Sequence, residues 1–233
     1  MVDRLLAAAQ PPRTKVAPPR ALVVPHAGYD YSGPVAATAY ALLQRDRRRR
    51  VVVLGPSHWT PLHGLAASDA EVWRTPLGDV PLDPPPAGVP VDAAAHRREH
   101  ALEVQLPFLV RLLEDPRLLP LAVGTGDPQA AADLLEPLWA DPSLLLVCST
   151  DLSHYLDQTS AQRRDERTAE AVVGLAVDRL GPHDACGVDA LRALLVLARR
   201  HGGTVDLLDL RTSADTAGDA HRVVGYGAFA LRG

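Results

Sequence analysis

The sequence predicts a single α/β domain whose central sheet is mostly parallel and is flanked by helices on both faces. Two observations lead to this prediction. Short runs of consecutive apolar residues, typical of strands buried on both faces, recur along the chain. Stretches with the period of amphipathic helices lie between these runs. Strands that alternate with helices form a largely parallel sheet covered on both sides, although the runs do not fix the order of the strands.

Composition narrows the class of protein. The chain has 233 residues, of which 47% are hydrophobic but only 4% aromatic, so a packed core must consist mainly of Leu, Val and Ala. A formal net charge of -4 argues against nucleic acid as the main partner. Two cysteines do not make a disulfide framework, so we expect a reducing, cytoplasmic compartment. No signal peptide or bilayer-spanning stretch is visible, so we expect no membrane association.

The first 20 residues are predicted to lie outside the main domain. Leu5 to Ala9 favour a short apolar helix, and a Pro-rich linker follows up to residue 20. The α/β domain then occupies residues 21–233.

The domain opens with a predicted strand over Ala21 to Val24. Ser32 is positioned to cap the helix that follows, and Pro34 suits its first turn, where a missing N–H costs nothing. We expect this helix to end near Leu43. Val51 to Leu54 form the next strand.

The middle of the chain is less regular. Residues 64–91 contain many prolines and are predicted to be a long excursion with short strand pieces. Residues 93–113 have a helical stripe of leucines, and Pro107 is expected to end or kink that helix. The remaining elements are strands at 119–123, 144–147, 205–210 and 223–231, and helices at 128–139, 158–180 and about 186–200.

Each of three predicted strands is followed by a loop that contains a histidine. His26, His58 and His154 follow the strands at 21–24, 51–54 and 144–147. In open α/β sheets this edge binds ligands, and neutral imidazole is the commonest metal ligand. We therefore predict that the loops converge on a metal site. Asp151, three residues before His154, makes that pair either ligands or an acid/base pair near a ligand.

Three further residues are candidates for the site. Cys186 lies at a predicted helix start, where the dipole and free N–H groups lower the pKa of a thiol. Its alternative role is that of a small packing residue. His100 and Glu103, spaced by three, share one helical face and either orient metal ligands or form a surface pair. No Gly-rich phosphate loop and no G-x-S-x-G elbow is present, which disfavours nucleotide-dependent chemistry and the usual serine hydrolases.

Five motifs occur in a fixed order along nearly the whole chain. They are Pro25-His26-Ala27-Gly28-Tyr29, Gly55-Pro56-Ser57-His58, Glu99-His100-Ala101-Leu102-Glu103, Ser149-Thr150-Asp151-Leu152-Ser153-His154 and Cys186-Gly187. In this order they resemble the Memo family, whose bacterial and archaeal members are called AmmeMemoRadiSam system protein B. That family is similar in fold to the class III extradiol dioxygenases, which are non-haem iron enzymes.

The resemblance implies a set of ligands and a cofactor. The metal-binding positions of the family fall on His26, His58 and Cys186, while Asp151 and His154 match the remaining polar residues of the site. The dioxygenases use a carboxylate where Cys186 stands. A thiolate is softer and favours iron(II), copper or zinc over magnesium or calcium.

The resemblance also implies a redox-type function with an open coordination position, iron(II) being the first expectation. In this hypothesis His154 acts as acid/base or binds substrate, and Asp151 orients it. The family name further implies a functional link to a radical-SAM protein and an AMMECR-type protein. The ligand would be a small molecule or a peptide. Members usually begin with an A-G-x-F-Y-P segment that this chain lacks, which raises the expectation of a truncated start.

Two alternatives stay open at this point. One is a metal-free hydrolase with Cys186, His154 and Asp151 as nucleophile, base and orienting acid. It leaves His26 and His58 without a role. The other is a non-enzymatic module whose pocket binds a peptide or partner protein, because a fold can persist without its chemistry.

Overall fold

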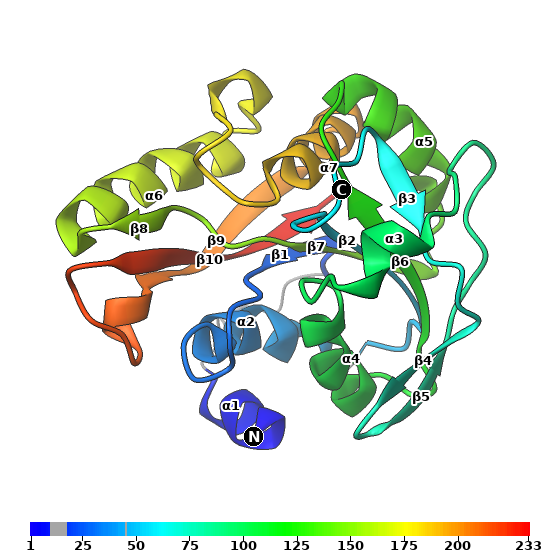
Figure 1. Ribbon diagram of the computed structural model, residues 1–233, viewed down its shortest axis with the longest axis horizontal. Coiled ribbons are helices and arrows are strands. Elements are labelled where there is room, and N and C mark those ends of the chain that lie inside the picture. The colour runs from blue at the N-terminus through cyan, green and yellow to red at the C-terminus, as the bar shows by residue number, and fades with distance from the viewer. Residues whose placement is uncertain (10–17, 45) are drawn as a thin grey trace.

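An eight-stranded sheet runs through the middle of the molecule (Figure 1). The computed structural model describes residues 1–9, 18–44 and 46–233. The sheet order is β3-β6-β2-β7-β1-β10-β8, and β9 also pairs with β10. Helices cover both faces, so the predicted α/β architecture is confirmed. The Pro-rich linker predicted before residue 20 falls largely on residues 10–17, outside the described residues.

The four central strands are parallel. They lie in the order β6-β2-β7-β1. Their bounds are β1 (Ala21–Val24), β2 (Arg50–Pro56), β6 (Arg117–Val123) and β7 (Leu144–Ser149). Every residue in them is buried except Arg50 and Arg117, which begin two of the strands. Burial on both faces is what the continuous apolar runs predicted.

The outer strands are antiparallel to their neighbours. β3 (Leu65–Ala67) borders β6 at one side of the sheet. At the other side β10 (Val223–Arg232) pairs with β1, with β8 (His154–Leu156) and with β9 (Thr204–Thr212). The sheet is therefore parallel at its centre and mixed as a whole.

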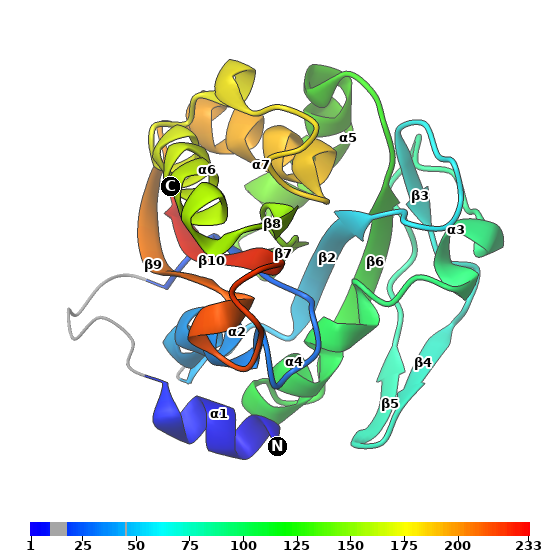
Figure 2. The ribbon, with the colours of Figure 1, turned by 60° about the vertical axis from the view of Figure 1, so that its left-hand side comes forward.

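The irregular stretch predicted at 64–91 contains β3 and a separate hairpin. The hairpin consists of β4 (Val72–Thr75) and β5 (Gly78–Pro81) and forms a separate small sheet beside β6, with Val80 packed into a core of the main sheet (Figure 2). Gly78 has φ +131° at the turn, a conformation that side-chain-bearing residues rarely adopt.

Alternation along the strands produces two hydrophobic cores. In β1, Ala21 and Val23 belong to one core and Leu22 and Val24 to the other. The first core lies under α5 (Pro128–Ala140), α6 (Gln158–Val173) and α7 (Val188–Arg200). The second lies under α1 (Val2–Ala8), α2 (Gly33–Tyr40) and α4 (Leu106–Leu112). Among the described helices, none combines the length and apolar character needed to cross a membrane.

Two predicted helices are interrupted. The stretch 93–113 divides into α3 (Ala93–Arg97), a turn, η2 (Glu103–Gln105) and α4. Pro107 lies in the first turn of α4 instead of ending a helix, because its missing N–H costs nothing there. The stretch 158–180 divides into α6 and η3 (Val177–Arg179), with Leu175 at φ 52° between them. The other short 3₁₀ turns are η1 (Ala41–Leu43) and η4 (Ser213–Asp215).

Ser32 precedes α2 but does not cap it through its side chain, contrary to the prediction. Its Oγ donates to the carbonyl of Ala27 at 2.7 Å. This hydrogen bond closes the loop that carries His26, so Ser32 shapes that loop instead of the helix end. Pro34 lies in the first turn of α2 as predicted.

Candidate metal centre

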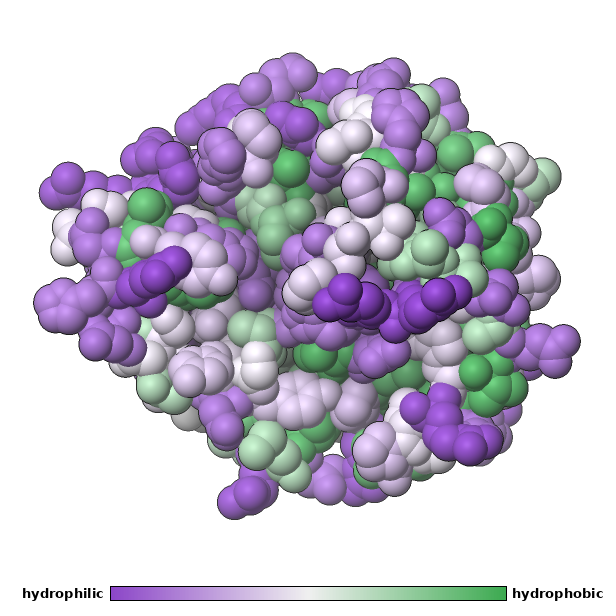
Figure 3. Space-filling view, in the orientation of Figure 1, coloured by the Kyte–Doolittle hydropathy of each residue, from purple (hydrophilic) through white to green (hydrophobic). Residues whose placement is uncertain are grey.

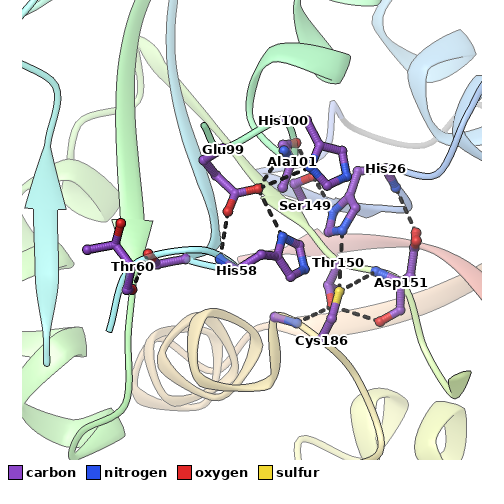
Figure 4. A network of polar contacts seen from close by, with 12 residues as sticks. His26, His58, Thr60, Glu99, His100, Ala101, Ser149, Thr150, Asp151 and Cys186 are labelled. Atoms are coloured by element: carbon purple, nitrogen blue, oxygen red, sulfur yellow. Dashed lines mark hydrogen bonds and ion pairs between the residues drawn. The ribbon is translucent and has the colours of Figure 1, made fainter. Parts of the chain in front are cut away.

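Three loops meet at the carboxyl edge of the parallel strands. His26 follows β1, His58 follows β2, and Cys186 precedes α7 beside the end of β7. Figure 4 shows the two imidazoles and the thiol pointing toward one another. Their ligand atoms all lie within 4.8 Å of one another and could hold a metal ion. The predicted convergence of the His26 and His58 loops is therefore observed.

His26 is held in one tautomer by a buried serine. Its Nδ1 lies 3.0 Å from Ser149 Oγ, and its Nε2 lies 3.4 Å from Cys186 Sγ. The only hydrogen of the Ser149 hydroxyl goes to the carbonyl of Ala101, 2.7 Å away. Ser149 must then accept from His26, so Nδ1 carries the proton and Nε2 presents a lone pair. Burial lowers the pKa of His26, which favours this neutral form.

The serine is in turn fixed from the core. Gln105 Nε2 donates to Ser149 Oγ at 2.8 Å and to the carbonyl of Pro25 at 3.0 Å. Tyr40 Oη donates to Gln105 Oε1 at 2.9 Å. Because a carbonyl only accepts, Pro25 fixes the orientation of the Gln105 amide. An uncharged chain of hydrogen bonds therefore runs from α2 to His26.

His58 is held differently, by a carboxylate. Glu99 Oε2 accepts from the backbone N–H of His58 at 2.6 Å, and Oε1 accepts from His58 Nδ1 at 2.9 Å and from Ala101 N–H at 2.9 Å. Burial by itself raises the pKa of Glu99, but these hydrogen bonds outweigh it and lower the pKa to about 2. With Nδ1 bound to a carboxylate, His58 keeps Nε2 free, as metal-ligating histidines commonly do.

Cys186 is fixed against the loop after β7. Its N–H donates to the carbonyl of Asp151 at 3.1 Å, and its Sγ accepts from the N–H of Asp151 at 3.3 Å. Gly187 N–H donates to Thr150 Oγ1 at 2.8 Å. A Cβ on Gly187 would lie 2.9 Å from Thr150 Cβ and 3.1 Å from the carbonyl of Ser149, so this close approach requires glycine.

The predicted lowering of the Cys186 pKa is wrong. Burial raises the pKa of this thiol to about 12, and the charge of Asp151 adds to the effect. Cys186 precedes Gly187, the N-cap of α7, and hydrogen bonds from Thr150 and Asp151 only partly oppose the desolvation. The second cysteine, Cys148, is buried in the core as expected, and both thiols are free.

Asp151 and His154 do not form the predicted pair. The Asp151 carboxylate is occupied by the backbone N–H groups of His26, at 2.8 Å, and Ala27, at 3.4 Å. His154 Nδ1 lies 2.8 Å from the carbonyl of Leu152. Within the described part of the chain, His154 makes no hydrogen bond or ring contact with His26 or Asp151. Asp151 instead secures the loop of the first histidine.

His100 makes ring contacts with the cluster, whereas Glu103 interacts with His100 and Glu99 only through its charge. The ring of the exposed His100 stacks on His58 at 5.4 Å and meets His26 edge-on at 5.6 Å. Its Nδ1 lies 3.5 Å from Glu99 Oε1. Glu103 is exposed and makes no hydrogen bond to His100 among the residues described, because the turn after α3 breaks the helical spacing on which the predicted pair depended.

A cavity of about 420 Å³ adjoins the cluster. The residues that line it include His58, Trp59, Thr125, Cys186 and Asp189. A ligand in this space would lie directly against two of the three grouped donors.

Sequence reasoning missed the residues that position the histidines. Glu99 and Gln105 lie in or next to the motif that contains His100, so their place in the motif was an available signal. Ser149 is the last residue of a strand that leads into a loop of the site, and this position was a weaker signal. Tyr40 lies in an apolar helix and gives no signal, because its contact depends on how α2 packs.

Comparison with known proteins shows one family. A family model described as "Memo-like protein" matches residues 1–230. A "MEMO1 family protein" of Methanococcoides burtonii is 37% identical over 229 residues, covering 90% of this chain and 85% of its own. One of Thermotoga maritima is 34% identical over 235 residues, covering 93% and 84%. The structure of an uncharacterized Escherichia coli K12 protein aligns with TM-score 0.49 and 14% identity, covering 89% of this chain and 98% of that one. The chain belongs to the Memo family.

Proposed function

We propose that the protein binds a divalent transition metal through His26 Nε2, His58 Nε2 and Cys186 Sγ and serves a redox-type reaction there. Iron(II) is our first choice, with copper or zinc as alternatives. One observation carries the proposal. Three donors from segments far apart in sequence lie within 4.8 Å of one another. A shared ion gives such a convergence a physical reason.

The donor set suits such an ion. The proton of each imidazole is engaged elsewhere, at Ser149 for His26 and at Glu99 for His58, so both Nε2 atoms offer lone pairs. Two neutral imidazoles and one thiolate favour soft or borderline cations over magnesium or calcium. Three protein ligands leave a coordination position open, as catalytic sites do. When bound, iron or copper would supply Lewis acidity and a change of oxidation state, whereas zinc would supply Lewis acidity alone.

The other residues of the site would transfer a proton, position the metal ligands or contact the bound ligand. With Nδ1 of His154 directed at the carbonyl of Leu152, Nε2 is left to accept a proton, which supports an acid/base role. Asp151 contributes by securing the His26 and Cys186 segments. The exposed ring of His100 lies beside both histidines and would contact whatever occupies the open side.

The cellular setting is part of the proposal. The family suggests a shared pathway with a radical-SAM protein and an AMMECR-type protein. A cytoplasmic location fits two free cysteines, one of them offered as a metal ligand.

The geometry favours the metal site over the thiol hydrolase. That alternative needs Cys186 beside His154. The imidazole nitrogen that contacts Cys186 Sγ is instead Nε2 of His26, at 3.4 Å, and burial raises the pKa of the thiol to about 12, so the metal-free thiol is a poor nucleophile.

Elemental analysis of anaerobically purified protein tests the proposal. The wild type is expected to contain about one metal per chain, and His26→Asn, His58→Asn and Cys186→Ser to lose most of it. His221→Asn, at an exposed position, is the matched control and should retain the metal. Equal metal content in Cys186→Ser and wild type would remove Cys186 from the ligand set, and a metal-free wild type would refute the proposal.

A further inference from the structure

A second group of metal-ligand atoms lies next to the first. His58, Glu99 and His100 each offer one ligand atom, and these atoms lie within 4.8 Å of one another. We call these residues the outer group, and we call His26, His58 and Cys186 the inner group. The side chains of His58 and His100 are 29% and 54% exposed, whereas that of Glu99 is 1% exposed. The outer group therefore combines a buried carboxylate with two imidazoles that solvent reaches.

The carboxylate of Glu99 is directed at both imidazoles of the outer group (Figure 4). Its Oε1 lies 2.9 Å from His58 Nδ1 and 3.5 Å from His100 Nδ1. Two nitrogen or oxygen ligands of a tetrahedral zinc ion lie about 3.3 Å apart, because each is about 2.0–2.1 Å from the metal. The two rings are close to parallel, with 22° between their planes and 5.4 Å between their centroids. Small movements of the exposed His100 ring would bring these three atoms to ligand spacing.

A cation can replace a proton beside Glu99 without loosening the carboxylate. In the structure, Oε1 accepts from His58 Nδ1–H and from the N–H of Ala101, and Oε2 accepts from the N–H of His58. When an ion binds His58 Nδ1, the ring proton leaves to solvent and Oε1 exchanges one hydrogen bond for one coordination bond. Both hydrogen bonds from backbone N–H groups are kept. Glu99 can therefore serve as a ligand from the position that it already occupies.

The surroundings of the outer group are polar and carry charges of both signs. Figure 3 shows strongly hydrophilic residues on the surface near α3, the helix that ends two residues before Glu99. Glu103 interacts through its charge with His100 and Glu99 and adds a second carboxylate. Arg97 and Arg98 precede the group and oppose the attraction of a cation. Because of these arginines and of the hydrogen bond that the ion replaces, we expect the outer group to bind more weakly than the inner group and to lose its ion during purification.

We propose that His58 Nδ1, Glu99 Oε1 and His100 Nδ1 bind a second divalent cation of the borderline class, such as zinc or cobalt(II). Two imidazoles and a carboxylate suit such ions, whereas the thiolate of the inner group favours softer ones. The inner ion uses Nε2 of His58 and the outer ion uses Nδ1. With both ions present, the His58 ring has no ring proton and bridges them. The outer site shares only this ring with the inner site, so it does not require the inner ion.

Titration of the metal-free protein with cobalt(II) under anaerobic conditions tests the outer site, with bound metal counted by equilibrium dialysis. The wild type is expected to bind about two ions per chain, the second about tenfold or more weakly, since a hydrogen bond to a charged group is lost. A thiolate-to-cobalt absorption band in the near ultraviolet identifies the inner ion. His100→Asn should bind one ion and keep that band, and Cys186→Ser should lose the band but keep the outer ion. His221→Asn, at an exposed histidine outside both groups, is the matched control and should bind as the wild type does.

The outcomes separate the outer site from the proposed function. A wild type that binds only one ion and shows the thiolate band overturns the outer site, as does a His100→Asn variant that binds as many ions as the wild type. Electron paramagnetic resonance of the doubly loaded protein tests the bridge, because a shared ring couples the two ions and reduces the signal. A signal equal to the sum of two isolated ions overturns the sharing of His58. A wild type that never shows the thiolate band, but loses an ion in His100→Asn, contradicts the proposed function and supports the outer site.

Discussion

The two candidate histidine ligands reach the same tautomer by opposite means. His26 is buried, and uncharged groups from the core hold it through Ser149 and Gln105. His58 lies on an exposed loop and is held by Glu99, a buried carboxylate that stays charged. The first arrangement depends on complete hydrogen bonding and the second on charge. Damage to the first should therefore appear mainly in folding stability, and damage to the second mainly in metal affinity.

The largest effect on metal affinity is expected from Glu99→Gln. The amide cannot accept at both oxygens, so His58 loses a partner and one donor faces an NH₂ group. Loss of such a carboxylate typically lowers metal affinity about 10- to 100-fold. Competition with a chelator measures it. Glu71→Gln, at an exposed glutamate away from the cluster, is the matched control and should leave the affinity unchanged. Wild-type affinity in Glu99→Gln would contradict the role of the carboxylate.

Ser149→Ala should mainly reduce stability. It leaves His26 Nδ1–H, one N–H of Gln105 and the carbonyl of Ala101 without their partner, at a cost of about 1–3 kcal/mol. Denaturant unfolding measures this, and ¹⁵N spectra should show His26 gaining the other tautomer. Ser153→Ala is a control for the tautomer, because it also removes a buried serine hydroxyl, but one beside Asp165 instead of His26, and should leave the His26 tautomer unchanged. An unchanged His26 tautomer in Ser149→Ala would show that Ser149 does not fix the proton on Nδ1.

Asp165 is a second buried carboxylate, and unlike Glu99 it has an oxygen that accepts no hydrogen bond among the described residues. Its Oδ1 accepts from Ser153 N–H at 3.0 Å, but no described group pairs with the buried Oδ2. Burial raises the pKa of Asp165 from 3.8 to about 6, whereas the fully bonded Glu99 has its pKa lowered. Between about pH 4 and 6 the folded state keeps a proton that the unfolded state has lost, so stability falls as pH rises through this window.

Asp165→Asn should remove that part of the pH dependence. Above pH 7 the variant is expected to be more stable than the wild type by about 1–2 kcal/mol, and the gain should shrink toward pH 4. Thermal or denaturant unfolding over this pH range measures it. A constant difference at all pH values would show that Asp165 does not titrate in the window.

The smallest effect is expected from Tyr40→Phe. It removes the donor to Gln105 Oε1 at the far end of the hydrogen-bond chain, for a loss of about 1 kcal/mol in unfolding free energy. Metal affinity should change less than in Ser149→Ala, because Pro25 still fixes the Gln105 amide. A fall in affinity as large as that of Glu99→Gln would mean that the two histidines are not held in the contrasting ways described.

The sequence predicted those features of the fold that depend on residues close together along the chain. Continuous apolar runs located the four central strands, because burial on both faces demands such runs. Strand order and the antiparallel sides were not predictable, because they depend on pairings between distant segments. The turn at Glu99 was also missed, since its hydrogen bonds to His58 and Ala101 are made only in the folded chain.

The site shows the same limit. Loop position after a strand selected His26 and His58, which the structure groups, but it selected His154 equally, and only the resemblance gave Cys186 the role of a ligand. The Asp151–His154 pair was predicted from spacing alone, but the Asp151 carboxylate binds backbone N–H groups of the first histidine loop instead. Spacing shows which residues are neighbours along the chain, but it does not show which competing donor a carboxylate will choose.

The contact between His26 and Cys186 joins positions 160 residues apart. An ion shared by these residues and His58 would act as a cross-link that closes two large loops of the chain. Closing such loops removes conformational entropy from the unfolded state, and a ligand bound only by the folded state stabilises it in proportion to its occupancy. Loading the site would then couple β1, β2 and α7 into one cooperative unit. Hydrogen exchange in these three elements should slow together as the ion is added.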